Sequence, residues 1–262
     1  MVRRRPTSLF HPIGSVDQRV LKRQSQLVTQ LNRRGVLRGA VSLGALTMLT
    51  GCDISDDEQV RGALEAVSAL NNRVQAALFD PNKLAPTYAV DQVLKPPRYN
   101  AYYPVDKVRP IDLTTWQLAV TGLVQDQRPW RPADFATMPQ REDIIRHVCV
   151  EGWDYIGQWS GVPLRAFLEK VGADLTARYV GFKCFDGYTS SIDMAAALHP
   201  QTLLATHYAG EPLGDPFGAP VRLRTAIKLG YKNPKWITEI LVSNTWRNGY
   251  WEDRGYNWFG GI

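Results

Sequence analysis

Apolar positions along the chain recur with two periods, one typical of helices and one typical of strands. Between residues 57 and 78 they recur every three or four positions, which predicts an amphipathic helix containing Val60, Leu64, Val67, Leu70, Val74 and Leu78. Shorter helices are expected at 163–172, which has a proline at its start and a glycine at its end, and at 193–200. Apolar and β-branched runs predict strands at 116–124, 144–150, 178–185, 202–208, 219–225 and 236–244. Strands outnumber helices and the two types are mixed in order, so we expect an α+β domain with a mainly β core.

Two segments between these elements lack periodicity. Residues 81–110 are rich in proline and tyrosine, which predicts extended, loop-like chain on the domain surface. The stretch F-D-G-Y-T-S-S, from Phe185 to Ser191, contains the turn signal Asp186-Gly187 and is expected to form a loop. Its carboxylate, phenol and hydroxyl groups either line a pocket or belong to an ordinary turn.

Charge is distributed unevenly along the chain. The net charge is +6, but residues 1–52 hold nine Lys and Arg against one acidic residue. The remaining 210 residues hold 22 basic and 24 acidic side chains. The basic excess therefore belongs to the first 52 residues, and we expect no nucleic-acid partner for the rest of the chain.

The first 52 residues have the architecture of an export signal. The stretch R-R-G-V-L-R-G, which begins at Arg33, precedes twelve small or apolar residues. Twelve is too few for a membrane-spanning helix, which needs about 20, but suits a signal peptide. The paired arginines resemble the twin-arginine signals of proteins that are exported after folding. The stretch L-T-G-C, which ends at Cys52, resembles a lipobox, whose cysteine becomes a lipidated N-terminus. A buried helix with an isolated cysteine is the alternative.

These features divide the chain into three parts. Residues 1–52 are expected to form an N-terminal extension and signal peptide, 53–67 an acidic tether and the start of the first helix, and 68–262 a single domain. We therefore predict a periplasmic protein that is exported by the twin-arginine route and anchored to the membrane through a lipid on Cys52.

The stretch R-H-V-C-V-E-G-W contains the first candidate for chemistry. If it is a strand, His147, Cys149 and Glu151 share one face. A thiolate suits a transition metal, but the ligand spacing of a zinc site is absent from the sequence. The alternatives are that Cys149 is a small buried side chain or that it forms a disulfide with Cys184.

A run of basic residues at 216–238 is the second candidate, because it contains no acidic residue. Its basic side chains are Arg222, Arg224, Lys228, Lys232 and Lys235. Concentrated cations suit a phosphate or another anion, with Arg as a forked donor and Lys as a point charge. A solvated basic face explains the run equally well. A third feature, Asn71-Asn72, lies within the first predicted helix, where asparagine is unfavourable unless a ligand or a helix break requires it.

Four stretches together resemble the sulfite oxidase-like molybdopterin oxidoreductases. They are H-V-C-V-E-G-W, F-D-G-Y-T-S-S, F-G-A-P-V-R-L and K-N-P-K-W, which occur in the order of that family and extend the resemblance over about residues 68–245. The similarity is closest to the exported bacterial branch that includes the catalytic subunit of protein-methionine-sulfoxide reductase. The resemblance implies a sulfite oxidase-type fold, a Mo-molybdopterin cofactor, and insertion of that cofactor before export.

The resemblance also implies a set of cofactor-binding residues, which comprises Asn71, Cys149, Cys184, Arg222, Asn233 and Lys235. Cys149 is the expected molybdenum ligand, beside the dithiolene of one molybdopterin. Arg222 and Lys235 are expected to hold the pterin and its phosphate, with the backbone near Asn233 contributing.

The chain also departs from the sulfite-oxidising members of the family. They follow the cysteine with C-x-G-N-R-R, whereas this chain reads C-V-E-G-W-D and so lacks the arginines that would attract a dianionic substrate. Thr206 stands where they have a tyrosine. Only 26 residues follow Trp236, so we expect no dimerisation domain and a monomeric protein. We also expect no haem module, so a membrane cytochrome b or a soluble cytochrome c is the expected electron partner.

We therefore predict oxygen-atom transfer, such as reduction of a sulfoxide or another S- or N-oxide, in which His147, Tyr188 or His207 delivers protons. Sulfite dehydrogenation is the alternative within the family. The alternative from another class is a cofactor-free lipoprotein that binds an anionic ligand through the basic run.

Overall fold

The structure is a computed structural model that describes residues 58–80 and 82–262. The twin arginines, the short apolar segment and Cys52 lie outside these residues. Residues 68–262 form one compact unit, and helix α3 (Glu58–Leu78) crosses the boundary of that unit. Among the described residues, no helix has both the length and the hydropathy that crossing a bilayer requires.

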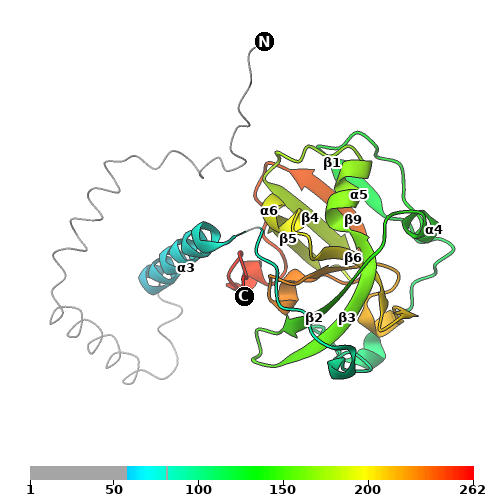
Figure 1. Cartoon of the computed structure of the whole chain (residues 1–262). Helices are drawn as coiled ribbons and strands as arrows, with labels where there is room; N and C mark the ends of the chain where they lie inside the picture. Colours follow the sequence, from blue (N-terminus) through cyan, green and yellow to red (C-terminus); the bar gives the residue numbers. More distant parts are fainter. Residues whose placement is uncertain (1–57, 81) are drawn as a thin grey trace, which may run out of the picture. The chain divides into compact units, whose positions relative to one another are not determined.

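Two sheets form the framework of residues 68–262 (Figure 1). The first contains, in spatial order, β1 (Ala119–Gly122), β9 (Ile237–Ser243), β4 (Tyr179–Cys184) and β5 (Thr189–Asp193). Strands β1 and β9 are parallel, and the other neighbours are antiparallel. The second sheet is antiparallel and contains, in spatial order, β2 (Arg141–Val148), β3 (Asp154–Pro163), β6 (Thr202–Tyr208) and β7 (Glu211–Pro212), with β8 (Arg222–Thr225) also paired to β6.

Helices in this unit are short and connect the strands. The α-helices are α4 (Pro132–Ala136), α5 (Leu164–Lys170) and α6 (Met194–Ala197). The 3₁₀ helices are η2 (Val90–Gln92), η3 (Val105–Lys107), η4 (Asp215–Phe217), η5 (Gly230–Lys232) and η6 (Glu252–Arg254). Helix α6 begins after Asp193, whose carboxylate accepts a hydrogen bond from the Ala196 N–H at 2.7 Å and so caps the first turn.

The hydrophobic core joins both sheets to α5. One buried cluster contains Val180 of β4, Ile240 of β9, Leu204 of β6 and Phe167 of α5. Burying a side chain of this size stabilises the fold by about 1.5–3 kcal/mol. A second cluster surrounds Trp159 of β3 and packs against the side of the second sheet that carries β8. The two clusters hold the strand ends that surround the cavity described below.

Most of the expected elements are confirmed. The three expected helices correspond to α3, α5 and α6, and the six expected strands correspond to β1, β2, β4, β6, β8 and β9. The described residues 82–110 contain little regular structure, as expected, apart from η2 and η3. The mainly β character of the α+β domain is confirmed as well.

Strand β3 was not expected from the sequence because Gly157 and Gly161 interrupt its pattern. Glycine in a strand interior normally weakens the strand. Here a Cβ at residue 157 would lie 2.6 Å from the Trp159 Nε1, and a Cβ at residue 161 would lie 2.1 Å from the Leu204 carbonyl oxygen. Close packing therefore requires both glycines, and pairing to β2 and β6 compensates for their low propensity.

The loop expected at 185–191 is shorter than the sequence indicated. Its last residues, from Thr189 onward, belong to β5, and Ser190 and Ser191 are buried in that strand. Strand pairing with β4 satisfies the backbone of both serines, although the buried Ser190 hydroxyl has no partner among the described residues. The Ser191 hydroxyl donates to the Arg247 carbonyl oxygen at 2.6 Å.

Helix α3 spans the predicted range, but part of its apolar side is exposed. The exposed fractions of Leu70, Val74 and Leu78 are 57%, 46% and 80%. A tertiary contact explains the presence of Asn72 in this helix, because its side-chain oxygen accepts a hydrogen bond from the Phe259 N–H at 2.9 Å. Tertiary contact therefore compensates for an unfavourable helix residue at this position.

Candidate active site

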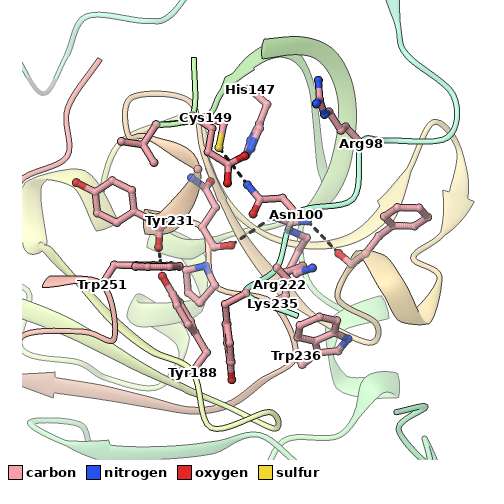
Figure 2. A pocket seen from close by; sticks show the side chains of 18 of the residues that line it. Arg98, Asn100, His147, Cys149, Tyr188, Arg222, Tyr231, Lys235, Trp236 and Trp251 are labelled. Atoms are coloured by element: carbon pink, nitrogen blue, oxygen red, sulfur yellow. Dashed lines mark hydrogen bonds between the residues drawn. The ribbon is translucent and has the colours of Figure 1, made fainter. Parts of the chain in front are cut away.

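A cavity with an empty volume of about 840 Å³, including its open mouth, contains most of the residues expected to bind a ligand. The expected residues that line it are His147, Cys149, Tyr188, Arg222, Asn233 and Lys235. Figure 2 shows Cys149 and His147 on one side of the cavity and Arg222 and Lys235 beneath them. The fold therefore brings together residues that are up to 88 positions apart in the sequence.

Cys149 lies in the turn between β2 and β3, one residue beyond the end of β2. The turn is closed by hydrogen bonds from the Cys149 N–H to the Trp153 carbonyl oxygen at 2.9 Å and from the Gly152 N–H to the Cys149 carbonyl oxygen at 3.1 Å. Gly152 has a φ of +87°, which favours glycine. The expectation that Cys149 and Glu151 continue the strand is therefore wrong, although both line the cavity.

Three hydrogen-bond donors act on the sulfur of Cys149. The Asn100 side-chain amide donates to it at 3.3 Å, and the backbone N–H groups of Glu151 and Val150 favour its thiolate form. Burial raises the pKa of the thiol above its ordinary value, and these donors oppose the rise. A cation bound to the sulfur would supply the charge that the thiolate needs and displace the proton. Cys149 and Cys184 are both free, so the alternative of a disulfide between them is not realised.

Arg222, which is buried, and Lys235, which is half-buried, face the cavity without a carboxylate partner. Arg222 donates to the Phe217 carbonyl oxygen at 3.0 Å and to the Asn233 carbonyl oxygen at 3.3 Å. The Lys235 ammonium donates to the Pro216 carbonyl oxygen at 3.1 Å. Among the described residues, neither cation forms an ion pair with an acidic side chain.

The pKa values of these two cations reflect their burial. Burial lowers the pKa of Lys235 to about 6, with the nearby charge of Arg222 adding to the effect. Burial lowers the pKa of Arg222 to about 10. An isolated buried charge is costly unless an opposite charge compensates for it. The arrangement is therefore suited to an anionic ligand that reaches both side chains.

The remaining cations of the basic run are buried as well, but they stabilise the fold. Lys228 pairs with Asp193 at 3.0 Å, and Lys232 pairs with Glu252. Arg224 donates to the Asn233 side-chain oxygen at 2.9 Å and to the Arg146 carbonyl oxygen at 2.7 Å. The alternative of a solvated basic face is therefore wrong, because all five basic side chains expected there belong to a compact region. Lys232 is the most buried of the five, with 0% of its surface exposed, and Lys235 is the least buried.

Similarity to known proteins agrees with this site. Residues 104–251 match the family described as "Oxidoreductase molybdopterin binding domain". The match covers more than half of the chain and includes Cys149, Arg222 and Lys235.

The chain belongs to this family of molybdopterin-binding oxidoreductases. It is therefore an enzyme that uses a Mo-molybdopterin cofactor, as expected from its resemblance to sulfite oxidase-like proteins.

Individual relatives support the assignment to the family. The putative protein-methionine-sulfoxide reductase subunit YedZ1 of Azospira oryzae is 53% identical over 229 residues, which is 87% of both chains. The protein-methionine-sulfoxide reductase catalytic subunit MsrP of Xanthomonas campestris pv. campestris is 30% identical over 59% of this chain and 56% of that protein. MsrP of Ralstonia nicotianae is 33% identical over 48% of this chain and 43% of that protein. The chain thus spans about half the length of these MsrP relatives.

One solved structure shares part of the arrangement. The sulfane dehydrogenase SoxCD from Paracoccus pantotrophus is 18% identical, with a TM-score of 0.49. The similarity covers 53% of this chain and 40% of that chain.

The cavity of this molybdopterin oxidoreductase fits its cofactor. The buried cations provide charge for a phosphate, and the free thiol with its three donors provides one soft ligand. No group of three or more His, Cys, Asp or Glu side chains suited to a metal occurs in the described part of the chain. A site with a single protein ligand is compatible with a metal whose other ligands belong to the cofactor.

The three candidates for proton transfer lie in different surroundings. His147 lines the cavity and is buried, and its Nδ1 lacks a hydrogen-bond partner. Burial lowers the pKa of His147 well below its ordinary value, with the charge of Arg224 as the next cause, so the ring is neutral at pH 7. Tyr188 donates its hydroxyl proton to the Tyr231 carbonyl oxygen at 2.5 Å, and burial raises its pKa. His207 lies on β6 and does not line the cavity.

Two of the expected cofactor-binding residues also lie away from the cavity surface. Asn71 is exposed on α3 and does not line the cavity. Cys184 is buried at the end of β4 and does not line the cavity. Burial raises the pKa of its thiol, the charge of Asp186 adds to the rise, and the charges of Lys235 and Arg222 oppose it.

Several cavity residues were not expected from the sequence. Asn100, rather than Asn71, approaches the sulfur of Cys149, and Arg98 lies on the opposite side of the cavity from Tyr188 in Figure 2. Both belong to the aperiodic segment 81–110, which was expected on the surface. The only signal in the sequence is a cluster of polar and aromatic residues, R-Y-N-A-Y-Y, within that segment.

Proposed function

We propose that this enzyme is an extracytoplasmic reductase of sulfoxides or related S- or N-oxides, with Cys149 as the protein ligand of molybdenum. One observation supports this proposal above the others. A free, buried thiol lines the same cavity as the basic side chains Arg222 and Lys235, neither of which has a carboxylate partner among the described residues. The basic run alone would also suit an anion-binding lipoprotein, but the thiol with its three hydrogen-bond donors has no purpose in that alternative.

Different groups of the chain would bind different parts of the cofactor. Arg222 and Lys235 would bind the phosphate, and the backbone at Asn233 would contact the pterin. Asn100 would orient the sulfur of Cys149, because its amide lies 3.3 Å from that atom. Asn233 is itself fixed, since its side-chain oxygen accepts hydrogen bonds from the Thr225 N–H at 2.7 Å and from Arg224. These contacts fix the position of Asn233 before the cofactor binds.

The proposed reaction consumes two electrons and two protons. The sulfur–oxygen bond of the sulfoxide breaks, and the products are a thioether and water. The bound cofactor supplies the two-electron oxygen-atom chemistry. His147 supplies a neutral hydrogen-bonding ring inside the cavity, and the exposed carboxylate of Glu151 lies at the cavity surface. Tyr188 is a less suitable proton donor because its proton is already engaged by Tyr231.

The names of the relatives support the choice of substrate. The Azospira protein and the MsrP proteins are named as subunits of protein-methionine-sulfoxide reductases. The turn after Cys149 also lacks the arginines that a dianionic sulfite would require. We therefore place a sulfoxide above sulfite as the substrate.

The proposal includes location and partners. The twin arginines, the short apolar segment and the lipobox-like stretch before Cys52 support export of the folded, cofactor-loaded enzyme to the periplasm and a lipid anchor. The electrons would come from another protein, and a membrane cytochrome b is the partner that best suits an anchored enzyme. The term "subunit" in the names of the relatives agrees with such a partner. We propose a monomeric catalytic chain.

An activity assay tests the proposal directly. Purified enzyme is supplied with a reduced viologen dye, and oxidation of the dye is followed with dimethyl sulfoxide, methyl phenyl sulfoxide, trimethylamine N-oxide or sulfite as the second substrate. We expect dye oxidation with sulfoxides, with the thioether as product, and no sulfite oxidation with an electron acceptor. Sulfite turnover without sulfoxide turnover would contradict the proposal.

A further inference from the structure

The chain continues beyond the end of the family match, and this continuation reaches the cavity. We call residues 249–261 the C-terminal strap. The family match ends at Trp251, which lines the cavity that contains Cys149, and Tyr256, beyond the match, lines the same cavity. The strap therefore adds Tyr256, a side chain that the shared domain does not supply, to the site.

Polar contacts hold the strap firmly against the domain. Lys232 forms its buried ion pair with Glu252, and the Tyr231 hydroxyl donates to the Asn257 carbonyl oxygen at 2.5 Å. The Trp258 Nε1 donates to the Ser191 hydroxyl at 2.8 Å. A buried ion pair is a costly contact unless its geometry is fixed, so these contacts specify one position for the strap.

Close packing fixes the two ends of the strap as well. At residue 249 a Cβ would lie 2.5 Å from the Thr189 carbonyl oxygen, so only glycine fits there. The Lys228 ammonium lies 3.2 Å from the centroid of the Phe259 ring, a favourable cation–π distance. The residues between these ends are therefore presented to the cavity on a fixed backbone.

On the cavity side, Trp251 and Tyr256 of the strap form an aromatic wall together with Tyr231 of η5, and we call these three residues the aromatic wall. The ring centroids of Trp251 and Tyr256 are 4.9 Å apart, and those of Tyr231 and Tyr256 are 5.5 Å apart. Figure 2 shows Trp251 and Tyr231 on one side of the cavity and Arg98 on the other. The hydroxyl of Tyr231 is engaged by Asn257, so the wall presents mainly ring surface.

The wall extends from a buried ring to an exposed one. Tyr231 is 8% exposed, like Arg222 at 7%, whereas Tyr256 is 36% exposed. The cations suit the anionic cofactor, and the aromatic surface near the mouth suits an apolar, polarisable group. Aromatic rings attract both sulfur and other rings through such contacts.

We propose that the aromatic wall determines substrate specificity, because Trp251 and Tyr256 bind the organic substituent of the sulfoxide. This inference rests on the proposed function. It gives the enzyme a preference for sulfoxides with an aryl or long alkyl substituent over dimethyl sulfoxide, whose methyl groups are too small to cover the wall.

Steady-state kinetics of the cofactor-loaded enzyme tests the inference. In Trp251→Ala and Tyr256→Ala, we expect kcat/KM for methyl phenyl sulfoxide to fall about three- to tenfold, which is the loss of one sulfur–aromatic or ring–ring contact. In the same variants, kcat/KM for dimethyl sulfoxide should change less than twofold, and so should the molybdenum content. Trp246→Ala is the matched control. The ring centroids of Trp246 and of Trp258 in the strap are 4.1 Å apart, but Trp246 does not line the cavity. An equal fall for both sulfoxides in Tyr256→Ala, or an equal change of preference in the control, overturns the inference.

Binding of a sulfone separates this inference from the proposed function. Methyl phenyl sulfone has the same substituents but is not the substrate of the proposed reaction, and its binding is measured by tryptophan fluorescence of the loaded enzyme. We expect weaker binding in Tyr256→Ala than in the wild type. If the sulfone binds in this way but no sulfoxide is reduced, the wall stands and the proposed reaction fails. If sulfoxides are reduced with unchanged preference in both variants, the reaction stands and the wall has no role in specificity.

Discussion

The basic run supplies two pairs of basic side chains with opposite surroundings. Lys228 and Lys232 have carboxylate partners in Asp193 and Glu252. Arg222 and Lys235 have only carbonyl oxygens as hydrogen-bond partners and face the cavity. The first pair is compensated within the chain, so it stabilises the fold. The second pair is compensated only when an anion binds, so it stabilises the complex with a ligand.

The largest expected effect concerns the compensated pair. Lys232→Met leaves Glu252 buried without a partner, and we expect the free energy of unfolding of the cofactor-free protein to fall by about 3–5 kcal/mol. Urea unfolding followed by circular dichroism measures this change. The double variant Lys232→Met/Glu252→Leu removes both charges and should recover much of the loss. Equal stability of the wild type and the single variant would contradict the account.

Lys235→Met should have the opposite effect on the cofactor-free protein. Because it removes an amine whose charged form lacks a partner and whose pKa burial lowers to about 6, we expect the free energy of unfolding to stay unchanged or to rise on the order of 1 kcal/mol. The molybdenum content of the purified enzyme should fall about tenfold, because the phosphate loses one charged donor. Urea unfolding and elemental analysis measure the two quantities on the same preparation. Loss of stability together with full molybdenum content would remove the distinction between the two pairs.

A smaller effect is expected from pH on the affinity of the cofactor-free protein for an anion. The pKa of Lys235 is about 6 in the folded protein, below its ordinary value of 10.5, because burial disfavours the charged form. An anion favours the protonated form, so binding of sulfate to the cofactor-free protein should tighten as pH falls toward 6. Above pH 6 the affinity should weaken by up to about tenfold per pH unit, the limit for one linked proton. Calorimetric titration between pH 6 and 8 measures this dependence. Lys235→Met should abolish it, and an unchanged dependence in that variant would assign the proton to another group.

The sequence predicted the regular strands better than the parts of the site that come from irregular chain. Runs such as 202–208 and 236–244 have enough β-prone residues to specify strands locally. Strand β3 does not, because Gly157 and Gly161 carry no local preference and are required only by contacts with Trp159 and Leu204. Long-range packing, which a single local pattern does not reveal, determines that strand.

The same limit applies to the cavity. Cys149 and the basic run were noticed because a cysteine in an apolar run and a basic run without acids are unusual in themselves. The resemblance to the family then selected Arg222 and Lys235 from the run. Asn100 was missed because its contact with Cys149 joins residues 49 positions apart and lies in a segment without periodicity. Trp251 and Tyr256 were missed for a similar reason, since the ion pair between Lys232 and Glu252 positions them. Burial of the basic run also depends on tertiary contacts, so its spacing could not decide between a ligand site and a solvated face.

The most direct test of the central claim is the molybdenum content of the wild type and of Cys149→Ser, purified in parallel from a host that makes the cofactor. Serine keeps the size of the side chain but replaces the soft sulfur ligand, so the fold should remain intact. The account predicts about one molybdenum atom per chain in the wild type and a loss of at least tenfold in the variant, with unchanged circular dichroism. Equal molybdenum in both proteins, or a folded, active wild type without molybdenum, would contradict it.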